Sequence, residues 1–237
     1  MNTPTVTLLI FTLNEIEGMK QIMPRIDSDW CDEIIIVDGG STDNTDIWAE
    51  QQGYQVIRQS GPGLRMAYNE SVSKAKGDIV ITFSPDGNSI PELIPDLIKE
   101  QSKGFDMVIV SRYLDGAKSY DDDFITGFGN WIFTKTINLL HRGHYTDAMV
   151  IFRAWRRDLF TDLGIHKEEP YAIYEKLLGT NLGIEPLLSV RALKRKLRIT
   201  EIPGDEPARI GGERKLKVVK WGISYYLQIL RELWYWK

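Results

Sequence analysis

Short apolar segments alternate with amphipathic segments over the first 112 residues, and this alternation constrains the fold more than any other feature. The apolar segments, rich in β-branched residues, cover residues 5–12, 34–38, 54–58, 77–84 and 106–112. Between them, residues 15–26, 63–75 and 90–104 space their hydrophobic side chains at helical intervals, and another helix is expected up to Gln52. Continuous apolar strands separated by helices predict a mostly parallel sheet buried on both faces, in an open, doubly wound α/β architecture.

The second half of the chain is less regular. It predicts helices over 124–141 and 168–183, a strand over 147–155 that turns into a helix near Arg156, and a strand over 197–203. A length of 237 residues with 43% hydrophobic content fits one large domain. We expect the domain over residues 1–205, followed by a basic segment and a C-terminal amphipathic helix over 206–237.

Charge is unevenly distributed along the chain. The formal net charge of -4 argues against general nucleic-acid binding, which usually needs a basic face. Residues 191–220, however, hold ten Lys or Arg and four acidic residues, a local balance of +6. That segment is suited to contact phosphates.

Cysteine content and hydrophobic run lengths bear on location. The single cysteine, Cys31, cannot form an internal disulfide, and no charged and then apolar leader opens the chain, so a cytoplasmic location is expected. Nowhere do about 18 uncharged apolar residues run together, so no bilayer-spanning helix is predicted.

Polar residues follow several of the predicted strands. Asn14 with Glu15, Asp38, Asp86 and Arg112 each lie at or just past the carboxyl end of one. Open α/β sheets bind ligands outside the carboxyl ends of their strands, where the strand order reverses. We therefore expect these side chains to converge on one crevice.

The stretch "SPDGNSIPE" allows two interpretations of Asp86. It can be a plain loop in which Gly87 takes a positive φ and Ser89 caps the next helix. Alternatively, Asp86 and Asn88 direct a carboxylate and an amide oxygen toward one point, a ligand set that suits Mg²⁺ or Mn²⁺ with a diphosphate completing the coordination.

The stretch "VDGGSTDNT" is similarly open between a glycine-rich turn capped by Asp38 and Asp43 and a site where Asp38 binds a ribose or base edge. The chain has no G-x-G-x-x-G, no G-x-x-x-x-G-K-[ST] and no G-x-S-x-G. The main support for a dinucleotide-binding protein, a P-loop protein or a hydrolase with a nucleophile elbow is therefore missing. The three histidines show no metal-ligand spacing.

Five blocks in order, "FTLNE", "IIIVDGGSTDNT", "SPDGNSIPE", "VSRY" and "DAMVIFRAW", resemble the family 2 glycosyltransferases of the GT-A fold, and in particular the dolichol-phosphate mannose synthase type. The resemblance covers about residues 5–160, with weaker similarity over 206–220. It implies a nucleotide-diphospho-sugar domain, inverting transfer of a sugar to an acceptor, and a divalent metal, Mg²⁺ or Mn²⁺.

The resemblance also assigns residues to the nucleotide-diphospho-sugar donor. They are Phe11, Leu13, Asn14, Glu15, Asp38, Gly39, Ser41, Arg65, Ser84, Pro85, Asp86, Arg112, Arg209 and Lys215. Asp86 and Asn88 are the metal ligands it implies. Ser84 stands where the family has the first Asp of an Asp-x-Asp pair, and this loss of a negative charge is expected to weaken metal binding or to leave more of the coordination to the diphosphate.

Asp147 and Asp86 are the catalytic candidates that the resemblance implies. If the acceptor is an alcohol, Asp147 is the candidate general base. If the acceptor is a lipid phosphate, such as a polyprenyl phosphate, it is already anionic, and Asp147 only positions groups. Arg209 and Lys215 would stabilise the departing diphosphate.

The C-terminal stretch from Trp221 to Trp236 is too apolar for a freely solvated helix. It can pack on the domain, pair with a second subunit, or lie peripherally at a membrane interface. Two other functional classes remain open: a nucleotidyltransferase, and a nucleotide-sugar binding module whose activity was lost with the acid at Ser84.

Overall fold

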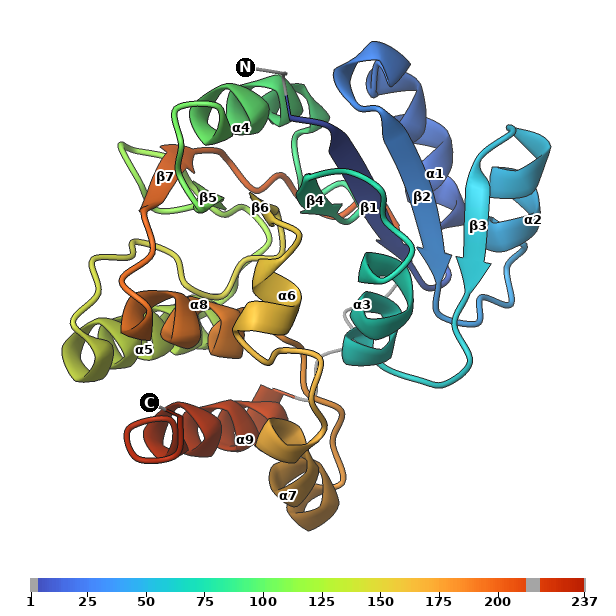
Figure 1. Cartoon of the computed structure of the whole chain (residues 1–237). Helices are drawn as coiled ribbons and strands as arrows, with labels where there is room; N and C mark the ends of the chain where they lie inside the picture. The colour runs from blue at the N-terminus through green and yellow to red at the C-terminus, as the bar shows by residue number, and fades with distance from the viewer. Residues whose placement is uncertain (1–3, 212–217, 237) are drawn as a thin grey trace.

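The computed structural model describes residues 4–211 and 218–236, and within them a seven-stranded sheet of order β3-β2-β1-β4-β6-β5-β7 forms the centre of the molecule (Figure 1). The strands are β1 (Val6–Thr12), β2 (Glu33–Asp38), β3 (Gln55–Arg58), β4 (Ile79–Phe83), β5 (Met107–Ser111), β6 (Arg153–Arg156) and β7 (Ile199–Pro203). All neighbours pair in parallel except β6, which is antiparallel to both β4 and β5. The predicted α/β fold with a mostly parallel open sheet is confirmed.

Helices cover both faces of the sheet. They are α1 (Ile16–Ile22), α2 (Thr45–Gln51), α3 (Leu64–Val72), α4 (Ile94–Gln101), α5 (Phe124–His141), α6 (Leu159–Asp162), α7 (Glu169–Leu178), α8 (Glu185–Lys194) and α9 (Val218–Arg231), with 3-10 turns at Met23–Arg25, Ser28–Trp30 and Pro91–Leu93. Alternate residues of β1 supply the two cores. Leu8 and Ile10 pack in the core that includes α1, α2 and α4, and Leu9 and Phe11 in the core that includes α3, α5, α8 and α9.

The strand order reverses beside β1. The chain runs outward from β1 through β2 to β3 and then returns to place β4 on the other side of β1. Thr12 at the end of β1 pairs with Asp38, and Ile10 pairs with Phe83, so the carboxyl ends of β1, β2 and β4 lie level. The loops after these strands therefore meet at one edge of the sheet, where a ligand of such a fold is expected.

Two predictions for the second half were wrong in detail. The strand expected over 147–155 is only β6, because the preceding backbone is bound by side chains instead of a ladder: Met149 N donates to Asp147 Oδ1 at 3.2 Å, and Thr82 Oγ1 donates to Ile151 O at 2.5 Å. The helix expected over 168–183 ends at Leu178, where Gly179 adopts a φ of 61°. Helix α8 follows and was not predicted.

Of two expectations for the loop after β4, one is confirmed and one is wrong. Gly87 does adopt a positive φ of 94°, as the loop interpretation required. Ser89 does not cap the next helix, because the 3-10 turn there begins after Ile90 without a side-chain cap. The first predicted helix stops early, at Ile22, and continues as a 3-10 turn that contains Pro24.

Helix α9 packs on its own domain. It contacts α5, α7 and α8, and its Tyr225 and Ile229 are part of the main core. Just after it, the buried carboxylate of Glu232 accepts from Arg191 Nε at 2.9 Å and from Nη2 at 3.0 Å. Within the described ranges 4–211 and 218–236, no helix is both long and apolar enough to cross a bilayer.

Gly18 sets how closely α1 approaches the loop after β4. A Cβ at this position would lie 2.3 Å from the carbonyl oxygen of Pro85, whereas a Cβ at Gly129 in α5 would meet no atom within 4 Å. Gly18→Ala is therefore expected to lower the free energy of unfolding by about 1–3 kcal/mol through overpacking. Gly129→Ala, the matched helical control, should raise it by about 0.5–1 kcal/mol. Urea unfolding of both variants measures the difference, and equal stabilities would contradict the close packing.

Candidate functional site

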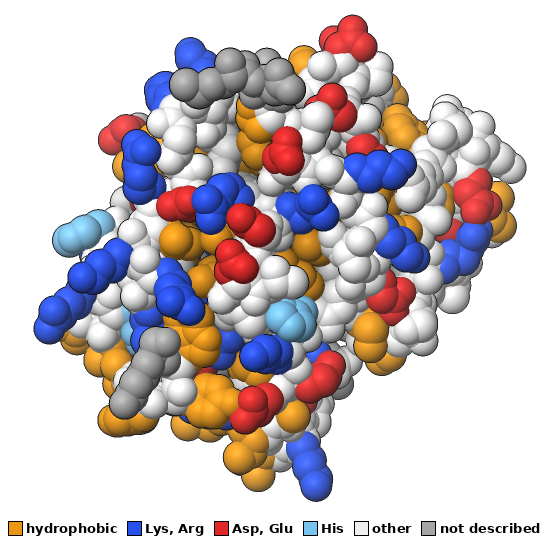
Figure 2. Space-filling model, viewed as in Figure 1, with side chains coloured by type: hydrophobic (Ala, Val, Ile, Leu, Met, Phe, Trp, Pro, Cys, Tyr) orange, Lys and Arg blue, Asp and Glu red, His pale blue; other side chains and the backbone are white. Residues whose placement is uncertain are grey.

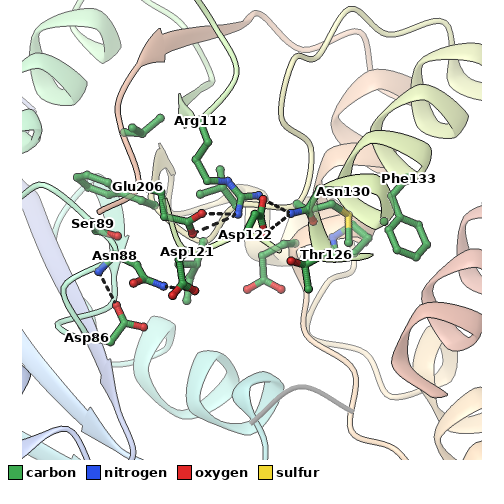
Figure 3. A pocket seen from close by; sticks show the side chains of 18 of the residues that line it. Asp86, Asn88, Ser89, Arg112, Asp121, Asp122, Thr126, Asn130, Phe133 and Glu206 are labelled. Atoms are coloured by element: carbon green, nitrogen blue, oxygen red, sulfur yellow. Dashed lines mark hydrogen bonds and ion pairs between the residues drawn. The ribbon is translucent and has the colours of Figure 1, made fainter. Parts of the chain in front are cut away.

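A cavity of about 320 Å³ opens at the carboxyl edge of the sheet, between the loop after β4 and helices α5 and α9 (Figure 3). Its polar lining comes from segments far apart in the chain: Asp86, Asn88, Ser89, Arg112, Asp121, Asp122, Thr126, Asn130, Glu185, Asp205, Glu206 and Arg209. Apolar side chains form the rest of the wall, among them Ile125, Phe133, Trp221 and Tyr225. The cavity thus has a charged end near β4 and an apolar end between two helices.

Asp38 builds the turn that positions Asn14. Its carboxylate is 1% exposed and accepts from Gly40 N at 2.8 Å, from Ser41 N at 2.9 Å and from Ser41 Oγ at 2.5 Å. Ser41 Oγ in turn accepts from Asn14 N at 2.9 Å, and Asn14 Oδ1 accepts from Thr42 N at 2.7 Å. This geometry is compatible with both interpretations of the stretch. Asp38 caps a glycine-rich turn, and a rigid turn of this kind is also a surface on which a nucleoside could bind.

Arg209 joins the loops after β1 and β4. Its Nη2 lies 2.9 Å from Asp86 Oδ2, and its Nη1 lies 3.3 Å from Glu15 Oε1. Glu15 is itself held by a hydrogen bond from its backbone N to Thr45 Oγ1 at 3.0 Å. Three residues that the sequence analysis assigned to the donor are thus in direct contact.

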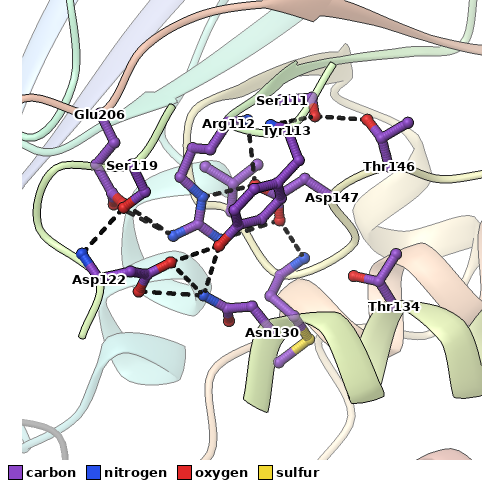
Figure 4. A network of polar contacts seen from close by, with 12 residues as sticks. Ser111, Arg112, Tyr113, Ser119, Asp122, Asn130, Thr134, Thr146, Asp147 and Glu206 are labelled. Carbon is purple, nitrogen blue, oxygen red and sulfur yellow. Dashed lines mark hydrogen bonds and ion pairs between the residues drawn. The ribbon is translucent and has the colours of Figure 1, made fainter. Parts of the chain in front are cut away.

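Arg112 and Asp147 form a buried ion pair behind the cavity (Figure 4). Arg112 Nε donates to Asp147 Oδ2 at 2.6 Å and Nη2 to Oδ1 at 3.0 Å, while Nη1 lies 3.2 Å from Glu206 Oε1. Burial alone would raise the pKa of Asp147, but the charge and hydrogen bonds of Arg112 outweigh it and lower that pKa. This geometry suits a residue that holds Arg112 in place better than one that accepts a proton.

Around this pair, a second layer of hydrogen bonds joins the loop before α5 to Glu206, to Tyr113 after β5 and to α5 itself. Ser119 Oγ donates to Glu206, Tyr113 Oη donates to Asp122, and Asn130 Nδ2 donates to Asp122 Oδ2 at 3.2 Å (Figure 4). Burial raises the pKa of Glu206 despite the nearby Arg112. The loop carrying the acids is therefore fixed against the cavity wall.

Several cavity residues were missed by the sequence analysis. Asp121 and Asp122 lie in a loop without a motif, and Glu206 opens the weakly similar stretch over 206–220 but received no role. Glu185 begins the unpredicted helix α8. Glu185 is buried, accepts from Tyr68 Oη at 3.0 Å, and has a pKa raised by that burial. The run of three acids at 121–123 was the one visible signal, and it does not by itself distinguish a site from a solvated loop.

Other predicted residues lie elsewhere. Phe11 is a core residue whose ring lies 4.5 Å from that of Tyr68. Arg65 does not line the cavity; it links α3 to α7 through Glu168 at 2.6 Å and Glu175 at 2.7 Å. Leu13, Gly39, Ser84 and Pro85 belong to the loops after β1, β2 and β4, and Lys215 falls outside the described residues.

The loop after β4 offers oxygen atoms that suit a divalent cation, provided that a bound substrate supplies the remaining ligands. Asn88 Nδ2 donates to Asp121 Oδ2 at 3.1 Å, while Asn88 Oδ1 is buried without a hydrogen-bond partner among the described residues. No group of three His, Cys, Asp or Glu in the described part of the chain could hold a metal ion. Mg²⁺ often takes one or two carboxylates and completes its shell with substrate phosphates and water, and Asp86 with Asn88 Oδ1 matches that pattern.

Comparisons with known proteins identify the family of the chain. The model of glycosyl transferase family 2 matches residues 28–164. Glycosyltransferase AglJ of Haloferax volcanii is 28% identical over 98% of this chain and 73% of its own length. A dolichol-phosphate mannosyltransferase of Pyrococcus furiosus is 27% identical over 90% of this chain, which spans only 59% of that enzyme.

Among solved structures, glucosyl-3-phosphoglycerate synthase of Mycobacterium tuberculosis superposes with a TM-score of 0.71 at 22% identity, over 97% of this chain and 80% of that one. The same enzyme has been solved with Mn²⁺, UDP-glucose and phosphoglyceric acid, with a TM-score of 0.69. This likeness confirms the GT-A fold. The chain belongs to glycosyl transferase family 2 and is a glycosyltransferase.

Replacing one partner of the buried pair separates a structural role of Asp147 from a purely catalytic one. Asp147→Asn is expected to lower the free energy of unfolding by about 1.5–3 kcal/mol, because it removes the charge-assisted hydrogen bonds that Asp147 accepts from Arg112 and leaves Glu206 to balance the buried guanidinium. Asp158→Asn, which removes an exposed partner of Arg156, should cost at most about 1 kcal/mol.

Urea unfolding at several pH values measures this effect. Because the pKa of Asp147 is lowered on folding, the difference from the wild type should be full above the ordinary aspartate pKa and shrink as the pH falls through the folded value. An Asp147→Asn protein as stable as the wild type at neutral pH would contradict the assignment.

Proposed function

We propose that this glycosyltransferase transfers a sugar, with inversion, from a nucleotide-diphosphate sugar to a polyprenyl phosphate at a membrane surface. The observation that carries the proposal is the cavity itself, which joins Asp86 and Asn88 at one end to an apolar wall between α5 and α9 at the other. A polar donor and an acceptor with a hydrocarbon tail would each find matching chemistry there.

The donor end is proposed from the loops after β1, β2 and β4. Asn14 and the turn held by Asp38 would bind the nucleoside, and Asp86 with Asn88 Oδ1 would hold a divalent metal against the diphosphate. The metal would supply positive charge that stabilises the departing nucleoside diphosphate. Mn²⁺ accompanies UDP-glucose in the structural neighbour from Mycobacterium tuberculosis, which supports this part of the proposal.

The cavity's own charges favour a cation-assisted donor. Among the described residues, its lining holds six carboxyl groups, those of Asp86, Asp121, Asp122, Glu185, Asp205 and Glu206, and two cationic side chains, Arg112 and Arg209. Arg112 is already shared by Asp147 and Glu206. A diphosphate that enters such a cavity needs a cation beside it, because like charges repel strongly in a partly buried site.

The acceptor is proposed from the apolar end and from the state of Asp147. A phosphate oxygen of a polyprenyl phosphate is already ionised and needs no base, which agrees with an Asp147 carboxylate engaged by Arg112 on both oxygens. The relative from Pyrococcus furiosus is named for a dolichol-phosphate acceptor, and another, from Aeromonas hydrophila, for undecaprenyl phosphate. Both names support an isoprenoid acceptor.

An exposed apolar surface adjoins this end of the cavity. Hydrophobic side chains gather along the lower part of the molecule in Figure 2, where Figure 1 places α5, α7 and α9. On α5, Phe124, Phe128 and Trp131 are more than half exposed, and their rings stack in sequence at 6.4 and 5.9 Å. Tyr226 of α9 lies 6.3 Å from Phe133, which lines the cavity.

We assign this surface, the α5–α9 face, to an anionic membrane. Aromatic side chains favour the membrane interface, and the exposed cations Lys135 and Lys220 lie on the same two helices. Continuity with the cavity would let the isoprenoid chain leave the bilayer directly into the apolar wall. The C-terminal helix considered in the sequence analysis thus contributes only part of the proposed contact, because α5 supplies three exposed aromatic rings, those of Phe124, Phe128 and Trp131.

Ser84 keeps one alternative open, a nucleotide-sugar binding module without turnover. Calorimetric titration with UDP-sugars and GDP-sugars, with Mn²⁺ or with chelator, followed by a transfer assay with a polyprenyl phosphate, tests both. Binding of one donor together with transfer supports the proposed enzyme. Binding without transfer to any lipid phosphate would favour the module.

Asp86 should be required for metal-dependent donor binding. Asp86→Asn keeps the shape of the loop but removes the carboxylate charge, and we expect it to weaken donor binding in Mn²⁺ at least tenfold, about 1.4 kcal/mol. Glu92→Gln, which changes the exposed acid that pairs with Arg25, should leave donor binding unchanged. Unaltered binding by Asp86→Asn would remove Asp86 from the proposed metal site.

If the α5–α9 face contacts a membrane, removing its exposed aromatic side chains should weaken binding to lipid vesicles in a sedimentation assay. The double variant Phe128→Ser, Trp131→Ser should bind vesicles containing phosphatidylglycerol at least tenfold more weakly than the wild type, since two interfacial aromatic anchors are lost. Ile47→Ser removes an exposed apolar side chain from α2, outside this face, and should bind as the wild type does. If the wild-type protein does not bind vesicles but self-associates through the α5–α9 face, a second copy of the chain covers this face instead of a membrane.

A further inference from the structure

Residues 204–211, which we call the strap, run across the carboxyl edge of the sheet and are fixed at several points. Gly204 N donates to Ser111 O at 3.0 Å, and Glu206 N donates to Lys118 O at 2.9 Å. Farther along, Ile210 N donates to Asp86 O at 2.8 Å. The strap is therefore attached to the backbone of the residue expected to bind the metal.

Gly87 permits this attachment. A Cβ at Gly87 would lie 2.6 Å from Cγ1 of Ile210 and 3.0 Å from its backbone N. The φ of 94° at Gly87 is also one that other residues rarely adopt. The same glycine thus shapes the Asp86 loop and leaves room for the strap to lie on it.

The attachment places a cation on Asp86. The Arg209 guanidinium lies 2.9 Å from Asp86 Oδ2 and 3.3 Å from Glu15 Oε1, and the side chains of these two acids are 9% and 7% exposed. The other Asp86 oxygen, Oδ1, accepts from Asn88 N at 3.1 Å. Both oxygens of the proposed metal ligand therefore have partners within the chain.

We propose that Arg209 is the resident counter-cation of Asp86 and that a divalent metal binds Asp86 only when the guanidinium leaves it. Two like-charged cations cannot share one partly buried carboxylate without strong repulsion, whereas either one neutralises it. Arg209 therefore competes with the metal in the donor-free protein. The inference rests on the proposed function for the identity of the metal site.

The released guanidinium has an anionic partner once the donor arrives. Arg209 lines the same cavity as Asp86, and planar guanidinium groups bind phosphate oxygens in bidentate fashion. The metal-bound diphosphate would thus take over the partner that Asp86 gives up. A metal that binds without the donor brings no phosphate to pair with the released guanidinium. The metal and the donor should therefore each bind more tightly when the other is present.

The test measures Mn²⁺ binding without nucleotide, by calorimetry or by loss of the free-ion electron paramagnetic resonance signal. Arg209→Gln should bind Mn²⁺ about tenfold more tightly than the wild type because the competing charge is gone. Arg209→Lys keeps the charge and should bind nearly as the wild type does. Arg25→Gln, which breaks the exposed pair with Glu92, is the control for a general change in net charge and should be silent.

The second arm repeats the measurement with UDP and GDP present. In saturating Mn²⁺, Arg209→Gln should bind the nucleoside diphosphate several-fold more weakly, because the guanidinium contact to phosphate is lost. Circular dichroism and thermal melting confirm that each variant is folded.

Mn²⁺ affinity in Arg209→Gln that is equal to the wild type, weaker or undetectable overturns the inference. Failure of this inference can be told apart from failure of the proposed function. Failure of every nucleotide-sugar to bind the wild type would reject the donor assignment, while Mn²⁺ binding without nucleotide would still report on Arg209 and Asp86.

Discussion

The ion pair between Arg112 and Asp147 is the interaction on which the cavity depends. Arg112 follows β5, Asp147 precedes β6, and the same guanidinium reaches Glu206 on the strap. A buried pair of this kind contributes little net stability relative to an apolar pair, but a single missing partner leaves a costly unpaired charge. Its effect is therefore to fix the relative positions of three segments, which no apolar contact would do with the same directional precision.

The sheet could be predicted from the sequence because its strands carry their own signal. Residues 34–37 and 79–81 are continuously apolar and β-branched, as expected of strands buried on both faces. The region before β6 carries no such signal, since its backbone follows two side-chain hydrogen bonds: a local one from Met149 N to Asp147, and one from Thr82 that joins it to distant β4. Helix α8 was missed because it is buried on nearly every side, including Glu185 and Arg191, so it lacks the polar face that marks a surface helix.

The site could be predicted only where it follows the sheet. Asp38 and Asp86 are found from strand ends, because parallel strands bring their carboxyl ends to one edge. Glu206 and Asp121 could not be found this way. Glu206 reaches Arg112 across 94 positions of sequence, and Asp121 reaches Asn88 across 33, in loops whose course is set by tertiary hydrogen bonds. Motif resemblance placed Arg209 near the donor, but its pairing with Glu15 and Asp86 required coordinates.

Those loop acids bear on the substitution at Ser84, which removes a carboxylate from the family's metal-binding pair. Asn88 donates to Asp121 through Nδ2, and this turns its Oδ1 away from that acid and leaves it buried and unpartnered among the described residues. Asp121 and Asp122 bring negative charge to the same cavity from another segment. The field felt by a cation depends on the sum of nearby charges, not on which residue supplies them. In the metal site proposed above, the loss at Ser84 would therefore change the direct ligands of the metal more than the electrostatic attraction that concentrates a metal there.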